Sequence, residues 1–406
     1  MPIASGSFLP VPRPGTCAAF IQICGARLWR RRLVEIVARA RDGQRSGKAL
    51  LQRHAIELAI DRQARGAVAT ARAELLVAGM AAEAVATYAR LTNEGRARLR
   101  ARMHQALEGE HTLAPVMHLF RTVALQRSRG FAVHHAALQD DAPFDLLISR
   151  DGTEAEIACD MISAEAGRDV HRGAWVNLMD RVDPDLQTWL AAHPGRYLLK
   201  LTLPQGLRDD QQGLAVLHQR IRTMLEGSRR ADHDEAAVLR LDPLMLAGAQ
   251  ASELGLAERG LMGSLRQEFG TEANLAVTTA GGGVFVLAAR AGRANEVAVA
   301  IRKRLAAIAP LRLSGTRPGI LAMLVEDTDR TEWRELRDRL ELEGETRQFL
   351  AHPSSRRVVA VTCASRLELL GADVPDAAPD GEMRFRNPAH PAAKAPGLAP
   401  AVLSTV

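Results

Sequence analysis

The chain has 406 residues, of which 47% are hydrophobic and 25% are charged, and its formal net charge is +6. This balance excludes a wholly disordered protein, and the length exceeds what one hydrophobic core usually holds, so two or three packing units are expected. Only four of the 53 basic residues are lysines, and the others are arginines. A planar guanidinium contacts an oxyanion at two points and so suits phosphate binding, although arginine-rich chains are equally typical of GC-rich genomes.

The four cysteines, Cys17, Cys24, Cys159 and Cys363, form no CxxC pair and no zinc-finger spacing. Free thiols in a reducing compartment explain them most simply. The apolar run 17–24 is too short to span a bilayer, and basic residues follow it, which is the wrong order for a secretory signal. We therefore expect a cytoplasmic protein without a membrane-spanning segment.

The N-terminal part is predicted to be helical after a short leader. Residues 1–26 contain several prolines and are expected to be flexible. From 27 to 129, leucine, isoleucine, valine and methionine recur at helical spacing between arginines, and glycines separate the segments. The first of these helices is basic, which suits contact with nucleic acid or an acidic partner, or simply a solvated surface.

Short β-type runs begin near residue 130. We expect a core over 130–230, whose strands lie at 131–137, 144–149, 154–162 and 196–203 and whose helices lie at 165–192, broken near Pro184, and 209–227. The first three strands follow one another closely and predict an antiparallel meander. The fourth follows a helix, which permits a crossover connection.

A second alternating block is expected over 231–368, so that the whole protein is α/β. Its strands are predicted at 236–242, 274–279, 284–290, 319–326 and 357–363, and its helices at 255–268, 295–309 and 331–351. The glycine run 281–283 predicts a hairpin turn, because glycine adopts positive φ freely. Residues 369–406 are rich in Ala, Pro and Gly and are expected to be a disordered tail.

The meander carries acidic residues in a pattern that suggests chemistry. Asp145 begins one strand, and Glu156, Ala158 and Asp160 alternate along the next. Side chains two apart in a strand share a face, so the last three point the same way, and Asp145 is placed to join them across the hairpin. Oxygen ligands of this kind suit Mg²⁺ or Mn²⁺.

A basic segment follows directly. Ser163 is expected to cap a helix, and Arg168, His171 and Arg172 are spaced three and four apart, which puts them on one helix face. Near a helix N-terminus, where backbone N–H groups favour anions, such a face would bind phosphate. A solvated basic face is the alternative.

This layout resembles the PD-(D/E)xK, or restriction-endonuclease-like, superfamily, and in particular uncharacterised bacterial proteins with a Glu-Cys-Lys strand. Ser163, Gly167, Arg168 and Arg172 match the helix of those proteins, and the strand 196–203 looks like its continuation. The resemblance implies a mixed-sheet nuclease core in which carboxylates hold Mg²⁺ or Mn²⁺ and a lysine helps to activate water.

Two positions depart from that pattern. Ala158 stands where the second metal carboxylate belongs, and Asp160 stands where the lysine belongs. Alanine cannot bind a cation, and aspartate cannot stabilise a developing oxyanion. In one interpretation Asp145, Glu156 and Asp160 form an altered metal site, with Arg168 in the role of the lysine.

In the other interpretation the core binds DNA or RNA through Arg168, His171 and Arg172 and has lost hydrolysis. A scaffold that binds only other proteins is a third possibility. The run Gly43–Ala49 does not form a phosphate loop, since three residues separate its glycines where four are needed and no strand precedes it.

Overall fold

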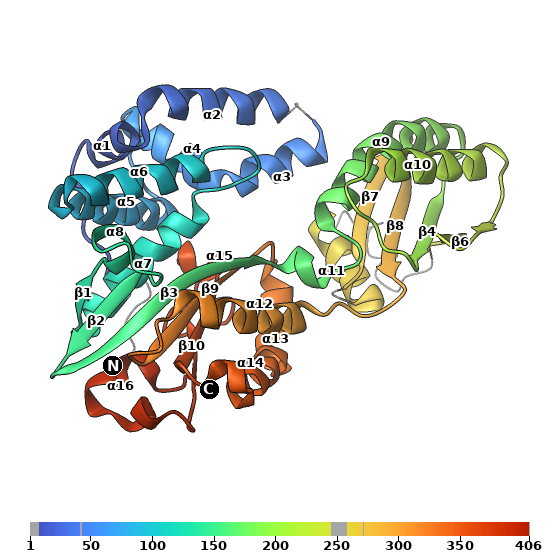
Figure 1. Ribbon diagram of the computed structural model, residues 1–406. Coiled ribbons are helices and arrows are strands. Elements are labelled where there is room, and N and C mark those ends of the chain that lie inside the picture. The colour runs from blue at the N-terminus through green and yellow to red at the C-terminus, as the bar shows by residue number, and fades with distance from the viewer. Residues whose placement is uncertain (1–7, 41–42, 245–257, 271, 406) are drawn as a thin grey trace. The chain divides into compact units, whose positions relative to one another are not determined.

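The computed structural model describes residues 8–40, 43–244, 258–270 and 272–405. They form a mixed α/β protein with two separate sheets (Figure 1). The chain divides into two compact units, which we call the first unit (Met1–Arg39, Leu51–Ala166 and Ala298–Val406) and the second unit (Ala40–Leu50 and Gly167–Val297). The main part of the second unit is thus inserted within the sequence of the first. No described helix is long and apolar enough to cross a membrane.

The first unit begins with helices, as the spacing of apolar residues predicted. These are α1 Thr16–Cys24, α2 Ala26–Arg39, α3 Arg45–Arg53, α4 Ala55–Ala64, α5 Arg72–Arg90, α6 Asn93–Ala106 and α7 Ala114–Ser128, of which α3 begins within the second unit. Thr92 caps α6 by accepting a hydrogen bond from the Gly95 N–H at 3.1 Å. The predicted flexible leader is wrong for α1, which buries Phe20 against the edge of Trp29, whereas residues 1–7 lie outside the described part of the chain.

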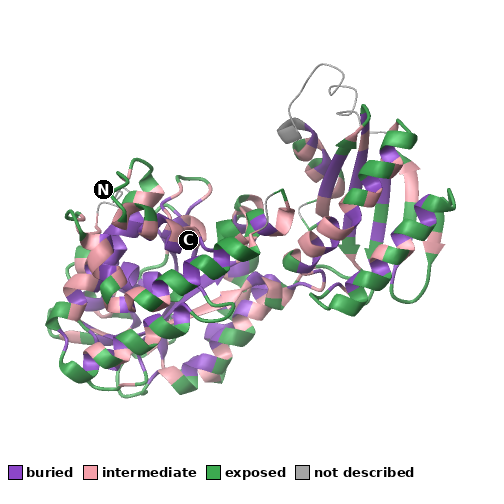
Figure 2. Ribbon diagram, turned by 90° about the horizontal axis from the view of Figure 1, so that it is seen from above, coloured by how far each residue is buried: buried purple, intermediate pink, exposed green. Residues whose placement is uncertain are grey.

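The first unit also contains a six-stranded sheet, in the order β1-β2-β3-β9-β10-β11. Its strands are β1 Ala132–His134, β2 Leu146–Arg150, β3 Thr153–Ser163, β9 Gly319–Glu326, β10 Val358–Ser365 and β11 Met383–Arg386. The antiparallel meander β1–β3 is confirmed. Strand β9 then pairs parallel with β3, and β10 pairs parallel with β9. Both β9 and β10 are buried along their whole length, as central parallel strands usually are (Figure 2).

Helices connect the parallel strands. They are α12 Val297–Arg312 before β9, and α13 Arg330–Asp338 and α14 Glu341–Ala351 before β10, with the short α8 Ala136–Gln139 and α15 Arg366–Leu369 elsewhere. The prediction of one helix over 331–351 is therefore wrong in one respect, because the chain breaks at Leu340, which has a positive φ of 59°.

The second unit has its own five-stranded sheet, in the order β5-β6-β4-β8-β7. Its elements are α9 Arg172–Ala192, β4 Arg196–Leu203, α10 Gln211–Glu226, β5 Ala231–His233, β6 Val238–Pro243, α11 Glu258–Phe269, β7 Asn274–Ala280 and β8 Gly283–Ala291. Gly281 and Gly282, with φ of 56° and 76°, form the predicted hairpin turn. The helix predicted over 255–268 begins partly outside the described residues.

The predicted core over 130–230 is divided between the two units. Its fourth strand, β4, pairs parallel with β8 in the second unit, and the parallel partner of β3 is β9. Both β4 and β9 follow helices and are apolar, so the pattern of residues within a strand does not show which of the two pairs with β3. Pro184 does not break α9, because a proline removes one backbone donor while the helix still buries Leu178, Val182, Leu186 and Leu190.

The predicted disordered tail is also wrong. Residues 369–405 contain β11 and the helix α16 Ala399–Val402, and they bury Phe385 and Val402. Strand β11 pairs with β10, and Glu382, just before it, is buried in an ion pair with Arg129 at 2.7 Å. A segment rich in Ala, Pro and Gly is thus ordered here because β11 extends the sheet and apolar side chains such as Leu398 and Val402 pack into the core beside Ile157 and Ile320.

Candidate functional site

The predicted site residues belong to different units. Asp145, Glu156 and Asp160 lie in the first unit, on β3 or next to β2, whereas the basic segment 168–172 lies in the second. We therefore describe the two groups separately.

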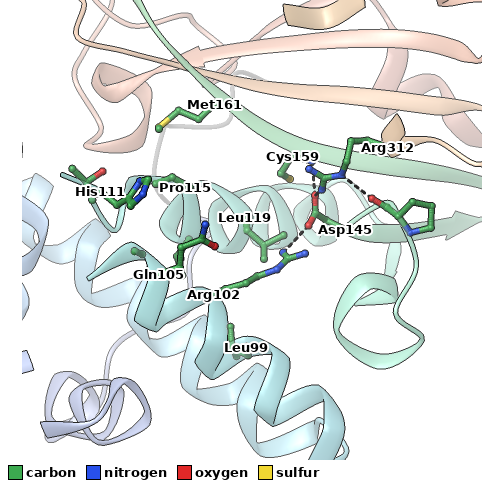
Figure 3. Close-up of a pocket in the computed structure, with 14 residues that line it drawn as sticks. Leu99, Arg102, Gln105, His111, Pro115, Leu119, Asp145, Cys159, Met161 and Arg312 are labelled. Atoms are coloured by element: carbon green, nitrogen blue, oxygen red, sulfur yellow. Dashed lines mark hydrogen bonds and ion pairs between the residues drawn. The ribbon is translucent and has the colours of Figure 1, made fainter. Parts of the chain in front are cut away.

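Asp145 directly precedes β2 and is 3% exposed. Its backbone N–H bonds to the Ile157 carbonyl at 2.9 Å, which holds it beside β3. Arg102 Nη1 lies 2.6 Å from its Oδ1, and Arg312 Nη2 lies 2.7 Å from its Oδ2 (Figure 3). The Cys159 N–H donates to the same Oδ2 at 2.8 Å. One carboxylate therefore joins α6, β3 and the end of α12.

Glu156 is fully buried and serves the turn after α12. It accepts hydrogen bonds from the Ser314 backbone N–H at 2.9 Å and from the Ser314 hydroxyl. The nearest guanidinium nitrogen, Nη1 of Arg317, is 4.0 Å from Oε1. Its carboxylate thus fixes the loop that enters β9.

Asp160 forms a two-point ion pair with Arg304 on α12. Arg304 Nε lies 2.6 Å from Oδ2, and Nη2 lies 2.9 Å from Oδ1. The hydrogen bond to Asp160 raises the pKa of Arg304 above its ordinary value. The position where the nuclease resemblance implies a lysine therefore holds an anion that is paired with a cation from another helix.

These carboxylates do not fit a shared Mg²⁺ or Mn²⁺ ion in this arrangement. Within the residues that the structure describes, no three His, Cys, Asp or Glu side chains form a group that could hold a metal. Ala158 lies buried between Glu156 and Asp160 and offers no ligand, and the carboxylates on either side hold separate partners. A divalent ion would have to displace arginine from Asp145 and from Asp160.

The basic segment does not form the predicted helix face. Helix α9 begins at Arg172, His171 is its N-terminal cap position, and Arg168 precedes the helix and is buried. The chain bends here because Gly167 packs on the backbone of Val297, where an added Cβ would lie 2.5 Å from the Val297 Cα. The role of these residues in binding nucleic acid remains a prediction.

Asp145 lies at one end of a pocket of about 380 Å³ in the first unit. The pocket lies between α6, α7 and β3 (Figure 3). It opens to solvent. Its lining consists of Leu99, Arg102, Gln105, Ala106, His111, Thr112, Pro115, Val116, Leu119, Pro143, Asp145, Cys159, Met161 and Arg312.

Arg102, Arg312 and Asp145 lie together at one end of this pocket, which we call the arginine pocket (Figure 3). Two guanidiniums face a single carboxylate, so Arg102, Arg312 and Asp145 together carry one net positive charge. Cys159 lies beside them, and burial together with the charge of Asp145 raises the pKa of its thiol, which disfavours the thiolate. The pocket thus offers cationic hydrogen-bond donors and no activated nucleophile among its lining residues.

No family model, curated protein or solved structure matches this chain. The site must be interpreted from its own geometry.

The N-terminus of α3 lies within the run Gly43–Ala49, which was not expected to form a phosphate loop. The backbone N–H groups of Arg45 and Ser46 donate to the two carboxylate oxygens of Asp180 on α9, at 2.7 and 2.9 Å. This helix end does bind an anion, as helix dipoles favour, but the anion is a side chain of the same unit.

A second polar cluster, which the sequence did not indicate, lies at the carboxyl ends of β3 and β9. Glu326 ends β9, is 3% exposed, and its Oε1 has no hydrogen-bond partner among the described residues. Arg366 Nη1 lies 4.0 Å from that oxygen. Burial raises the pKa of Glu326 to about 7; Arg366 and Arg53 act against the rise, and Asp327 and Glu57 add to it.

Proposed function

We propose that this protein binds nucleic acid through a degenerate nuclease-like core in its first unit and does not cleave it. The observation that carries the proposal is the position of Asp145 between Arg102 and Arg312 in an open pocket. In the resemblance to PD-(D/E)xK nucleases, Asp145 is the first metal ligand. Guanidinium groups that bind a carboxylate at this distance bind phosphate oxygens in the same way.

The layout of the first sheet supports a nuclease-derived origin. Three antiparallel strands lead to a parallel neighbour, β9, and an aspartate at the start of β2 lies beside an acidic β3. The resemblance implies a mixed sheet, and this arrangement supports the proposal in that respect. Fold likeness alone would leave the activity open, so the proposal depends on the side chains.

The partners of the carboxylates argue against hydrolysis. Asp160 is held by Arg304 at two points, and Asp145 is held by two arginines. Metal-assisted hydrolysis needs carboxylate oxygens that can turn to a cation. In this arrangement the arginines occupy those oxygens, which favours binding over cleavage.

DNA or RNA fits the charge of the chain, which is +6 with a large arginine excess. We place the protein in the cytoplasm, since Cys17, Cys24, Cys159 and Cys363 are all free thiols.

Fluorescence anisotropy with labelled single-stranded DNA, RNA and duplex DNA, over a series of NaCl concentrations, tests this function. We expect the logarithm of the association constant to fall linearly with the logarithm of salt, by about 0.9 per phosphate contact on a duplex. Arg102→Ala should lower that slope by about one, whereas Arg100→Ala, on the exposed side of the same helix, should leave it unchanged.

The same substrates are then incubated with Mg²⁺ or Mn²⁺. Cleavage that is lost in Asp145→Asn would establish a working metal site and overturn the proposal. If none of the three substrates binds in a salt-sensitive way, nucleic acid is excluded as the partner and a scaffold role is left.

A further inference from the structure

The arginine pocket has two chemically different ends. Asp145 and the guanidiniums of Arg102 and Arg312 form the polar end. The rest of the wall is formed mainly by apolar residues, Leu99, Ala106, Pro115, Val116, Leu119 and Met161, with the uncharged polar side chains of Gln105 and Thr112 and the imidazole of His111 between them. A ligand that fills the pocket must therefore join an anion to an apolar body, because an isolated phosphate would leave the apolar wall uncovered.

The size of the pocket limits that body. A volume of about 380 Å³ lies near the lower end of the range for small-molecule sites, roughly 300–1,000 Å³. It has room for a ligand of the size of one nucleotide, whereas a stacked base pair within a duplex cannot enter it. Bases that leave a stack are commonly held against side chains in such pockets.

The arginines keep donors for an incoming anion. Among the described residues, Arg102 makes one hydrogen bond, to Asp145, and Arg312 bonds to Asp145 and to the Pro143 carbonyl at 2.7 Å. Each guanidinium has five N–H donors, so several on each side chain are available to phosphate oxygens. The Asp145 carboxylate competes for the same groups and sets how strongly they attract another anion.

We propose that the arginine pocket takes one nucleoside monophosphate unit, with its phosphate on Arg102 and Arg312 and its base against the apolar wall. This inference rests on the proposed function and adds the ligand: an unstacked nucleotide of a single strand or a free mononucleotide. It also gives Asp145 a defined part, since an anion and this carboxylate compete for two guanidiniums.

The competition gives opposite signs for two substitutions. Arg102→Ala removes a donor and should weaken nucleotide binding about tenfold. Asp145→Asn removes the competing charge and should strengthen it by a similar factor. A purely structural role of the cluster predicts that both changes weaken binding, and so does a metal site in which Asp145 is a ligand.

Anisotropy competition on the full chain tests the inference. A labelled single-stranded oligonucleotide is displaced with nucleoside monophosphates, with the matching unphosphorylated nucleosides, or with inorganic phosphate. We expect monophosphates to displace it at lower concentration than either of the others, and single strands to bind more tightly than blunt duplexes. Arg100→Ala is the matched control, and Arg312→Ala is a second variant if thermal unfolding shows that Arg102→Ala does not fold.

The outcomes separate the two proposals. Displacement by monophosphates supports the inference if Arg102→Ala weakens nucleotide binding and Asp145→Asn strengthens it. Direct binding of a labelled mononucleotide without any oligonucleotide binding assigns the pocket to free nucleotides. Oligonucleotide binding that depends on Arg102 but that monophosphates do not displace overturns the inference and leaves the proposed function standing. Equal weakening by Arg102→Ala and Arg100→Ala overturns both proposals, because each places the phosphate contact on Arg102. No binding of oligonucleotide or mononucleotide overturns both.

Discussion

Asp145→Asn should destabilise the first unit, because it leaves two guanidiniums without their counter-charge. The carboxylate is 3% exposed, and the side chains of Arg102 and Arg312 are 36% and 30% exposed. Removing one partner of a buried ion pair costs roughly 3–5 kcal/mol, and solvent around the arginines screens part of this. Asparagine keeps an oxygen for the Cys159 N–H, so we expect a loss of about 3 kcal/mol.

Urea denaturation measures this loss as a shift of the midpoint at constant slope. The matched control is Asp160→Asn. Among the residues that the structure describes, Asp160 pairs only with Arg304, whose side chain is 46% exposed, so the loss of this pair should cost about 1 kcal/mol. If Asp145→Asn costs no more than Asp160→Asn, Asp145 does not hold the two helices as described.

Two further predictions concern the buried carboxyl at the end of β9 and the C-terminal segment. The pKa of Glu326 is raised to about 7, so its contribution to stability is fully present below its unfolded pKa of about 4.5 and is lost as pH rises through 7. Glu326→Gln should remove this pH dependence. In urea titrations, the difference in free energy of unfolding between variant and wild type should change by at most about 3 kcal/mol between pH 4.5 and 8. A constant difference across that range would contradict the raised pKa. Phe385→Ala should cost about 3–5 kcal/mol in the same assay, because this side chain is 2% exposed on β11, which pairs with β10. A loss below about 1 kcal/mol would show that residues 369–405 are not part of the folded unit.

Individual strands could be predicted from the sequence where their residues alternate or run apolar between turn signals. The strands predicted at 196–203 and 319–326 have the observed bounds. Their pairing could not be predicted, because the choice of β9 over β4 as the neighbour of β3 depends on contacts made after a whole inserted unit. The order of the C-terminal segment could not be predicted for a related reason, because its composition does not show that Phe385 lies on a strand that pairs with β10.

The partners of Asp145 in the arginine pocket could not be predicted from the sequence either. Asp145 could be singled out from its strand, whereas its arginines come from positions 43 residues before it and 167 residues after it. No local spacing links Arg102, Asp145 and Arg312, so their pairing cannot be predicted from sequence patterns. An excess of arginine was the only available signal, and it does not say which arginine lies where.

The insertion of the second unit between β3 and α12 has a consequence for how the protein is made. During synthesis the meander β1–β3 leaves the ribosome long before β9, whose Gly319 pairs with Glu156. The two ends of the insert are joined by a hydrogen bond from the Glu296 N–H to the Gly167 carbonyl at 2.7 Å. Pairing across so long a loop is slow, so β3 would keep an unpaired edge until the inserted unit has folded and brought its own ends together. Folding of the inner unit therefore sets the moment at which the outer sheet can close, and the acidic side chains of Glu154, Glu156 and Asp160 along β3 are well suited to keep that edge from aggregating in the meantime.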